Sequence, residues 1–578
     1  MKEKIIKIRH SLAHIMASVI MEFWPKTKLA IGPAIENGFY YDMELPKDFK
    51  PEDLKKIETR IKELIKENQK FTGKKVSKIT AKKLFKNQPY KLEIIKELPE
   101  KTVGTYQNGN FLDLCKGGHV KNTREIDPNS FKLTKIAGAY WRGDEKNKML
   151  TRIYGVAFET EKELMDYLKM QEEAEKKDHR KIGQELDLFT FSELVGPGLP
   201  LWTPKGTVIR EELEKFAKET EEKWGYQRIT TPHIAKKILF ETSGHLPYYK
   251  DDIFPGMKID DDEYYLKAMN CPMTIAMFGQ KPHSYREFPV RLSEYGTVYR
   301  YEKSGVLTGL LRTRGFTQND AHIFCREDQV EEEFINVMKL HEYYYRDVFG
   351  IKNYYIRLSL RDKNKKEKFG GDDTIWKKAE SIIRSATKKS DVPFKEELGE
   401  ASFYGPKADF QIKSVIGKEE TASTNQLDFI MPKRFGLSYV GKDGKNHDVV
   451  VIHRAPLGSH ERFIAFLIEH YAGAFPVWLS PIQAVIIPIS EKHLEYANKI
   501  KKELEKNNLR LELKNENETL GKKIREAEIQ KIPYFLIVGD KEIEAQSVSV
   551  RERGKGDLGQ IQLEEFIEKV NKEIKEKK

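Results

Sequence analysis

Three arginines and a carboxylate surround one loop of this sequence: Arg300, Glu302, Arg312 and Arg314. The flanking apolar and aromatic residues alternate, and Ser-Gly and Thr-Gly pairs interrupt them, which is the pattern of two strands joined by a long loop. A guanidinium presents a planar fork of donors that matches phosphate oxygens, whereas lysine offers only a point charge. The segment therefore predicts a hairpin that binds phosphate, with a solvated arginine-rich hairpin as the alternative.

A second set of reactive side chains lies near the start of the chain. His10 and His14 are four residues apart within a helical pattern, so both imidazoles face one side of that helix. Asp113, Cys115 and His119 follow much later, beside a pair of glycines. The histidines and the thiol are a typical donor set for zinc, and they also suit a pocket that activates water for hydrolysis. The third interpretation is that they are buried residues with unrelated structural roles.

These segments resemble class II aminoacyl-tRNA synthetases, and threonyl-tRNA synthetases in particular. The run R-G-F-T-Q-N-D-A-H-I-F-C resembles motif 2 of that class, and H-R-A-P-L-G-S-H-E-R-F resembles motif 3. The pair H-S-L-A-H and D-L-C-K-G-G-H resembles the editing domain shared by threonyl and alanyl enzymes. The resemblance implies a pocket that hydrolyses mischarged seryl-tRNA without a tightly held metal. Its residues would be His10, His14, Cys115 and His119, together with Asp113.

The resemblance also implies residues that bind ATP and activate threonine. Arg300 would hold the α-phosphate during in-line displacement, and Arg312 with Arg462 would clamp the outer phosphates. Glu302 would contact the adenine or the tRNA end. His245 would accept the proton of the terminal ribose hydroxyl, a step that suits a base with a pKa near neutrality. Further implied contacts are Gln318, Asp320 near the amino group, Tyr404, Lys407 near the carboxylate or phosphate, Gln426 and Ser459.

Cys271, His322 and His453 are the zinc ligands that the resemblance implies. They are too far apart in sequence to form a local zinc pattern, but M-N-C-P, D-A-H-I-F and V-I-H-R-A match the family's ligand segments. Three protein ligands leave a coordination position open for threonine. A Lewis acid that needs both an amino group and a hydroxyl rejects valine. Serine lacks only a methyl group, worth about 1 to 3 kcal/mol, so a hydrolytic site is needed as well.

Composition sets the cellular and chemical context. The 578 residues carry a formal net charge of +11, and Lys and Arg outnumber Asp and Glu by 38 to 28 over residues 1–185. This excess favours an RNA contact in the first third, although a generally lysine-rich composition is an equal alternative. Three cysteines argue against a disulfide scaffold. No apolar run approaches the ~18 residues of a membrane span, and no signal peptide is evident. We therefore expect a cytoplasmic protein without a membrane partner.

The elements that must position these residues predict an α+β multidomain chain. An amphipathic helix is expected over Pro51–Lys70, and a helix over Thr207–Trp224 resembles motif 1, which forms the dimer interface of the class. Only nine residues precede His10, which leaves no room for the ubiquitin-like domain that many family members carry. The predicted domains are an editing domain (1–160), a linker helix (161–185), a class II antiparallel-sheet catalytic domain (186–480) and an α/β anticodon-binding domain (481–578). In the last of these, Arg551 and Arg553 are candidates for contacting tRNA bases.

The resemblance, which extends over nearly the whole chain, implies a homodimeric threonine–tRNA ligase. It would use ATP with Mg²⁺, L-threonine and tRNA(Thr), and would hold one zinc ion in each catalytic domain. A prolyl-type class II ligase and a non-catalytic RNA-binding paralogue are the alternatives. The paralogue is favoured by departures from the family pattern: Thr421 stands where glutamine is usual, and Met273 and Thr274 replace Gly-His.

Overall fold

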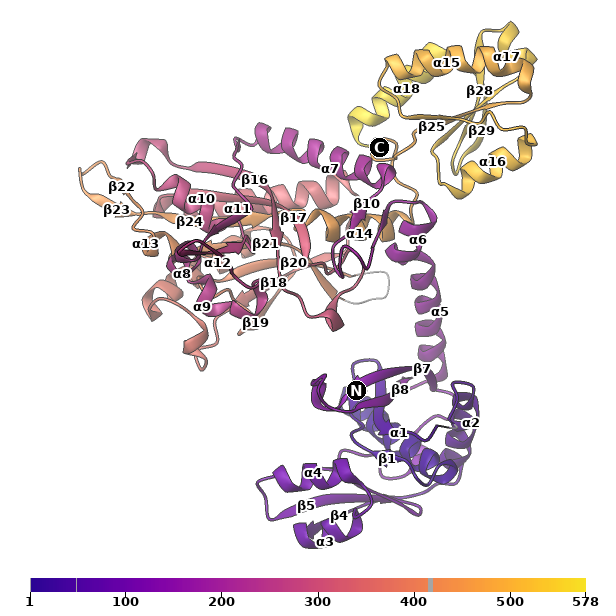
Figure 1. Ribbon diagram of the computed structural model, residues 1–578, viewed down its shortest axis with the longest axis vertical. Helices are drawn as coiled ribbons and strands as arrows, with labels where there is room; N and C mark the ends of the chain where they lie inside the picture. Colours follow the sequence, from indigo (N-terminus) through magenta and orange to yellow (C-terminus); the bar gives the residue numbers. More distant parts are fainter. Residues whose placement is uncertain (1, 48, 414–418) are drawn as a thin grey trace. The chain divides into compact units, whose positions relative to one another are not determined.

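The computed structural model describes residues 2–47, 49–413 and 419–578. It divides into two compact units, Met1–Glu172 and Glu173–Lys578, and each is described by itself (Figure 1). Among the described residues, no helix has the length and apolar character needed to cross a membrane.

The N-terminal unit contains two antiparallel sheets with helices packed on them. One sheet has the strand order β1-β3-β8-β7, with β2 paired to β3, and the other has the order β4-β5-β6. Helix α1 packs against β3 and α2, and its apolar side chains between Ile8 and Ile20 belong to the core of this unit. The elements are α1 (Lys2–Phe23), β1 (Lys28–Leu29), β2 (Ala34–Ile35), β3 (Gly38–Glu44), α2 (Asp53–Lys66), β4 (Phe71–Ser77), α3 (Lys78–Leu84), α4 (Pro89–Glu97), β5 (Thr102–Asn108), β6 (Phe111–Leu114), β7 (Phe131–Tyr140) and β8 (Met149–Ala157).

Helix α2 confirms the predicted amphipathic helix. Its buried side chains are Ile57, Ile61, Leu64 and Ile65, which recur at helical spacing along one face. The opposite face carries the lysines and glutamates that gave the segment its polar composition.

An eight-stranded sheet forms the centre of the larger unit. Its order is β11-β16-β17-β24-β21-β20-β18-β19, and all neighbours are antiparallel except the two edge pairs. The sheet strands are β11 (Gln227–Arg228), β16 (Val290–Tyr299), β17 (Gly315–Cys325), β18 (Tyr354–Leu360), β19 (Phe394–Leu398), β20 (Lys407–Lys413), β21 (Glu419–Asp428) and β24 (Val450–Ala455). Strands β16 and β17 pair in continuous register, which confirms the predicted hairpin.

Helices cover this sheet and short hairpins extend from it. The helices are α6 (His179–Glu185), α7 (Pro204–Lys223), α8 (Lys237–Ser243), α9 (His245–Tyr248), α10 (Cys271–Phe278), α11 (Val330–Glu342), α12 (Asp373–Lys389), α13 (Met431–Arg434) and α14 (His460–Tyr471). The minor strands are β9 (Phe189–Thr190), β10 (Leu201–Trp202), β12 (Ile234–Lys236), β13 (Met257–Ile259), β14 (Asp262–Leu266), β15 (His283–Ser284), β22 (Ser438–Val440) and β23 (Asn446–Asp448). The main core lies between the sheet and helices α7, α11, α12 and α14.

The C-terminal part of the larger unit is a mixed sheet with helices. Strands β26-β25-β27 are parallel and β27-β28-β29 are antiparallel. The elements are β25 (Ala484–Pro488), α15 (Leu494–Lys506), β26 (Leu511–Leu513), α16 (Leu520–Ile529), β27 (Tyr534–Val538), α17 (Asp540–Glu544), β28 (Ser547–Glu552), β29 (Gly556–Gln562) and α18 (Leu563–Glu576).

Arg553 differs from its expected role as a base reader. Its Nη2 donates to the carbonyl oxygens of Ala474 and Phe475 at 3.0 and 2.6 Å. Most of its donor capacity is thus directed at the polypeptide backbone rather than at a ligand.

The predicted single linker helix is two helices. Helix α5 (Glu161–Lys177) ends before Asp178, whose extended backbone and side chain cap α6 by accepting the N–H of Arg180 at 2.8 Å. Helix α6 then continues to Glu185, which is the predicted end of the linker. The polar composition of the segment concealed the break because Asp is compatible with both a helix interior and a cap.

Candidate functional site

The loop between β16 and β17 holds its arginines through backbone contacts. Arg300 Nε donates to the carbonyl of Ala268 at 3.1 Å, and Arg314 Nε donates to the carbonyl of Glu302 at 2.9 Å. The Glu302 carboxylate forms an ion pair with Arg312 at 2.9 Å. These contacts fix the direction of each guanidinium while leaving other N–H groups for a ligand.

Arg462 connects this loop to the motif 3 helix. It lies in the first turn of α14, where the N-cap hydroxyl of Ser459 accepts its backbone N–H at 3.2 Å. Its guanidinium donates to the carbonyls of Leu311 at 2.9 Å and Thr421 at 3.1 Å. Burial lowers the pKa of Arg462, and an anion bound beside it would offset that desolvation.

A cavity of about 180 Å³ opens between the loop, α14 and strand β21. We call it the arginine-lined cavity. The predicted contacts that line it are Arg300, Glu302, Arg312, Gln318, Gln426, Ser459 and Arg462, and Phe316, Thr421 and Thr424 line it as well. Three guanidinium groups around one small cavity are suited to a polyphosphate.

Cys271, His322 and His453 converge on one buried point. Their donor atoms all lie within 4.8 Å of one another, and we call this group the Cys-His-His cluster. Cys271 begins helix α10, whereas His322 and His453 are directly opposite each other on β17 and β24. The pairing of two neighbouring strands therefore brings together residues that are far apart in sequence.

The chemistry of these donors fits a metal ion. His322 Nε2 is buried and has no hydrogen-bond partner in the described structure. His453 Nε2 lies 3.0 Å from Asp428 Oδ2, so the ring N–H points to the carboxylate and Nδ1 keeps its lone pair. Burial lowers the pKa of His322 well below its ordinary range, which keeps that imidazole neutral. Asp428 was not predicted, because only its contact with His453 reveals its role.

His245 lies against this cluster. The Ser243 hydroxyl donates to the carbonyl of Phe240, so it accepts the Nδ1–H of His245 at 2.9 Å. Nε2 is left as the acceptor and faces Cys271 Sγ at 3.7 Å. Burial, helped by His453 and Arg300, lowers the pKa of His245 to about 3. The expectation of a base with a pKa near neutrality was therefore wrong, because the ring is enclosed rather than solvated.

The other predicted contacts surround the cluster and the cavity. Burial raises the pKa of Asp320 to about 6, while its Oδ2 accepts from Asn270 Nδ2 at 2.9 Å. The Tyr404 hydroxyl donates to Gln426 Oε1, and the Tyr404 ring centre is 5.1 Å from that of His453. Lys407 does not line the cavity, and its Nζ pairs with Asp409, a residue that was not predicted.

The departures from the family pattern occupy different environments. Met273 and Thr274 are buried on α10 and do not line the arginine-lined cavity. Thr421 does line it, and its hydroxyl accepts from Gln411 Nε2 at 2.8 Å. Of the three departures, only Thr421 is therefore positioned to alter a contact with a ligand in that cavity.

In the N-terminal unit, His10, Cys115 and His119 form a second cluster of donors within 4.8 Å of one another. Cys115 Sγ is 3.5 Å from His10 Nε2 and 3.2 Å from His119 Nε2, and the two imidazole rings stack. Gly117 and Gly118 have φ values of +106° and +93°, so the turn that brings Cys115 and His119 together needs residues without a Cβ. His14 packs edge-on against His119.

A buried ion pair completes this region. Lys91 Nζ is 2.6 Å from Asp113 Oδ1 and 2.9 Å from the hydroxyl of Tyr41, which donates to Asp113 Oδ2 at 2.5 Å. A cavity of about 400 Å³ is lined by these three residues together with His10, His14 and Cys115. We call it the N-terminal pocket. Neither Lys91 nor Tyr41 was predicted, because a lysine in a lysine-rich helix and a tyrosine in a strand carry no distinguishing pattern.

Burial keeps the histidines of this region neutral. It lowers the pKa of His14 to about 4 and that of His119 to about 2, and it lowers the pKa of His10 as well. Burial raises the pKa of Cys115, so its thiol is protonated at neutral pH. Neutral imidazoles around a large pocket can accept hydrogen bonds from water and orient it for attack.

Family models match three parts of the chain. Residues 255–471 match the tRNA synthetase class II core domain (G, H, P, S and T), and residues 483–573 match an anticodon binding domain. Residues 103–154 match the threonyl and alanyl tRNA synthetase second additional domain.

Whole-chain relatives carry one name. The threonine–tRNA ligase of Staphylococcus carnosus is 49% identical over 574 residues, covering 99% of this chain and 88% of the relative. That of Rubrobacter xylanophilus is 48% identical, covering 99% and 89%. A solved structure titled as the RNA binding domain of threonyl-tRNA synthetase from Cryptosporidium parvum aligns with a TM-score of 0.64 at 36% identity, covering 68% of this chain and 98% of that chain. A putative threonyl-tRNA synthetase from Aeropyrum pernix aligns at 0.60 and 30% identity, covering 70% and 96%.

The sheet, the arginine-lined cavity and the matching core model together define a class II aminoacyl-tRNA synthetase. Within that class, the chain belongs to the threonine–tRNA ligase family, since relatives of that name match it over nearly its whole length.

Proposed function

We propose that this chain activates threonine with ATP, transfers it to the terminal ribose of tRNA(Thr), and hydrolyses mischarged seryl-tRNA(Thr) in its N-terminal unit. The observation that carries this proposal is the convergence of Cys271, His322 and His453 in the same unit as the arginine-lined cavity. The Cys-His-His cluster could hold a metal ion that binds threonine, and the arginine-lined cavity could bind the phosphates of ATP. These are the two substrates of the first step. The names of the relatives support the same reaction.

In the activation step, the chain's cations would bind and orient ATP, which enters with Mg²⁺. Arg300 would hold the α-phosphate, where charge develops as the threonine carboxylate attacks. Arg312 and Arg462 would hold the departing pyrophosphate. Because Arg312 is paired with Glu302 in the structure, ATP binding would have to open that pair and leave Glu302 able to contact the base or the tRNA end.

Threonine would be recognised beside the Cys-His-His cluster. Cys271, His322 and His453 would hold a zinc ion, which supplies a Lewis acid with an open position for the amino and hydroxyl groups of threonine. Asp320, with a pKa of about 6, would be ionised at neutral pH and would accept a hydrogen bond from the amino group. Tyr404, Lys407, Gln318, Gln426 and Ser459 would complete the substrate contacts.

In the transfer step, His245 would accept the ribose hydroxyl proton at Nε2. The Ser243 hydroxyl fixes the required tautomer, because it binds the proton on Nδ1. The low pKa of His245 means that the imidazole is always neutral at physiological pH, although it is a weak base.

Editing would occur in the N-terminal pocket. Water would be oriented against the ester of seryl-tRNA by His10, His14, Cys115 and His119. Such a second site is needed because serine differs from threonine only by a missing methyl group, which the first site discriminates poorly. Lys91, held by Asp113, would contribute a positive charge for the substrate or the developing oxyanion.

The proposal extends to the assembly, location and tRNA contacts of the chain. The chain would form a homodimer, which is supported by exposed apolar side chains at Phe191, Leu194, Val195 and Leu201. The small, odd number of cysteines supports a cytoplasmic location. Lysine-rich N-terminal surfaces and the anticodon-type domain would contact tRNA.

The test is threonine-dependent ATP–pyrophosphate exchange combined with metal analysis. Wild type is expected to exchange and to contain about one zinc ion per chain. Cys271→Ser should lose the zinc together with at least 100-fold of the exchange rate, because a hydroxyl is a poor zinc ligand. Cys325→Ser is the matched control, since Cys325 is also buried but its thiol donates to the carbonyl of Val450 and does not belong to the Cys-His-His cluster.

Three outcomes would contradict parts of this proposal. Exchange with proline instead of threonine would assign another class II ligase. A folded, zinc-containing wild type that exchanges with no amino acid would indicate the RNA-binding paralogue. Undiminished exchange after zinc loss in Cys271→Ser would exclude the cluster from threonine recognition.

A further inference from the structure

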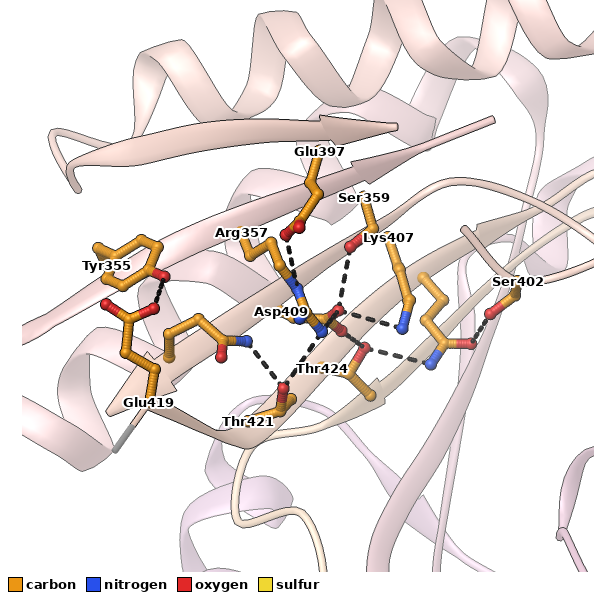
Figure 2. A network of polar contacts seen from close by, with 12 residues as sticks. Tyr355, Arg357, Ser359, Glu397, Ser402, Lys407, Asp409, Glu419, Thr421 and Thr424 are labelled. Atoms are coloured by element: carbon orange, nitrogen blue, oxygen red, sulfur yellow. Dashed lines mark hydrogen bonds and ion pairs between the residues drawn. The ribbon is translucent and has the colours of Figure 1, made fainter. Parts of the chain in front are cut away.

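A group of polar side chains lies on one face of β18, β20 and β21 (Figure 2). Two of them, Thr421 and Thr424, line the arginine-lined cavity. Arg357 is directly opposite Asp409, and Asp409 is directly opposite Thr424, on three neighbouring strands. Since side chains directly opposite each other share a face, the three groups are within hydrogen-bonding reach. Ser359 and Lys407 form the next pair along the same face.

A bulge brings Thr421 onto this face as well. Phe410 pairs with Ser423, but the next residue, Gln411, pairs with Thr421, so β21 contains one extra residue. Without it, residues 421 and 424 would point to opposite sides of the sheet. With it, the hydroxyl of Thr421 accepts from Gln411 Nε2 and, at 3.4 Å, from Arg357 Nη2.

Asp409 is the centre of this group. Its side chain is about 1% exposed and accepts from four donors. Oδ2 is 3.1 Å from Arg357 Nη2, 3.1 Å from Lys407 Nζ and 3.2 Å from Ser359 Oγ, while Oδ1 is 2.8 Å from Thr424 Oγ1. A buried carboxylate with two cations and two hydroxyls is fully hydrogen-bonded, so its own position is strongly fixed.

The same carboxylate orients residues that face the ligand. Because the Thr424 hydroxyl donates to Asp409, its oxygen is free to accept from Gln426 Nε2 at 3.1 Å. The opposite end of that amide accepts from Tyr404 and Ser402. Thr424 and Gln426 line the arginine-lined cavity, whereas Asp409 does not. Asp409 therefore lies behind the cavity wall and determines how that wall is hydrogen-bonded.

We propose that Asp409 is a positioning residue for the ligase reaction. It holds the ammonium group of Lys407 at the start of β20, directly opposite Gln426, and sets the donor direction of the Thr424–Gln426 pair. Asparagine at this position would keep the volume but would replace one acceptor oxygen with an NH₂ group. That donor would then face Lys407 and Arg357, and the two cations would lose their shared anion. This inference rests on the proposed function.

The test is threonine-dependent ATP–pyrophosphate exchange by Asp409→Asn, Lys407→Met and the double variant. Each single variant is expected to lower kcat about 100-fold, the scale on which misplaced reacting groups slow catalysis, with a smaller change in the KM for ATP. Because Asp409 acts mainly through Lys407, the loss in the double variant should be far smaller than the product of the two single losses. A merely structural role would instead make the two losses multiply.

A second variant covers the case in which Asp409→Asn does not fold. Ser359→Ala removes one hydrogen bond to the carboxylate without unpairing a charge, and Ser359 does not line the cavity. We expect about a threefold lower kcat in the wild-type background and no further loss in Lys407→Met. Glu419→Gln is the matched control: Glu419 lies on β21 and accepts from Tyr355 at 2.6 Å, but it makes no contact with Asp409 (Figure 2). Its exchange rate should equal that of wild type.

The outcomes separate this inference from the proposed function. If wild type does not exchange with threonine, the proposed function fails. If wild type exchanges and folded Asp409→Asn does so at the same rate, or if the losses of Asp409→Asn and Lys407→Met multiply, the positioning role of Asp409 is overturned while the proposed function stands.

Discussion

At the scale of single residues, the functional regions depend on buried polar groups that are each matched by a specific partner. Asp113 illustrates this. Burial alone would raise the pKa of its carboxyl, but Lys91 at 2.6 Å, His14 and the Tyr41 hydroxyl together outweigh that effect, so the pKa is lowered. Such pairs are costly to break, since removing one partner leaves a charge without water or a counterion.

Replacement of Lys91 by Met is expected to separate stability from hydrolysis. The single variant leaves Asp113 unpaired and should lower the free energy of unfolding of the N-terminal unit by about 3 to 5 kcal/mol. Adding Asp113→Asn removes the buried charge and should restore most of the stability. Deacylation of seryl-tRNA should remain lost in both variants, because the positive charge facing the pocket is gone. The measurements are chemical denaturation and release of serine.

Either of two results would contradict this view of Lys91. A Lys91→Met variant as stable as wild type would mean that the ion pair contributes nothing. A double variant that hydrolyses seryl-tRNA normally would mean that Lys91 acts only on stability.

At the scale of elements, a buried histidine connects α6, α14 and the loop that carries Arg312. His179 Nε2 accepts the backbone N–H of Leu310 at 3.2 Å, so its Nδ1–H donates to Glu469 Oε1 at 2.9 Å. Gly309 has a φ of +47°, and a Cβ there would lie 2.3 Å from His179 Nε2. The loop can approach the imidazole this closely only because residue 309 has no side chain.

His179→Ala is expected to loosen this loop and weaken ATP binding. Without the acceptor for the Leu310 N–H, the loop should sample more conformations, and the KM for ATP in pyrophosphate exchange should rise about tenfold. The KM for threonine should change little, because the Cys-His-His cluster is on other elements. Glu469→Gln keeps an acceptor oxygen for Nδ1–H and should behave as wild type. An unchanged KM for ATP in His179→Ala would refute this connection.

At the scale of the whole molecule, buried neutral histidines make the fold sensitive to acid. Burial lowers the pKa of His14 to about 4 in one unit and that of His460 to about 3 in the other. Above pH ~6.5 these rings are neutral in the folded and the unfolded chain. Below it, the unfolded chain binds protons that the folded chain does not, so stability falls as the pH drops toward the folded pKa.

Between pH 6.5 and 5, each such histidine is expected to lower the free energy of unfolding by about 2 kcal/mol. This follows because the free energy of unfolding changes by about 1.4 kcal/mol per pH unit when the two states differ by one bound proton. His460→Phe provides the check, because neither ring nitrogen of His460 has a hydrogen-bond partner in the described structure. The variant should be at least as stable as wild type at pH 7 and should lose less stability at pH 5. Thermal unfolding at the two pH values measures this, and equal losses in both proteins would contradict it.

The sequence alone determined the features whose signal is local. The hairpin of β16 and β17, the amphipathic face of α2 and the alternation of strands and helices in the C-terminal part follow from side-chain periodicity. The family was recognisable because its motifs are short runs of consecutive residues around Arg300, Arg462 and His10.

Only the tertiary structure decided the features that depend on contacts between distant segments. Lys91, Tyr41, Asp409 and Asp428 acquire their roles from partners on other strands or helices, and nothing in their sequence neighbourhood distinguishes them from solvated residues. The pKa of His245 was mispredicted for the same reason, since burial by the surrounding chain determines it rather than residue type. Periodicity records which face of an element is buried, but the identity of the groups that meet there is fixed only when strands such as β17 and β24 pair in register.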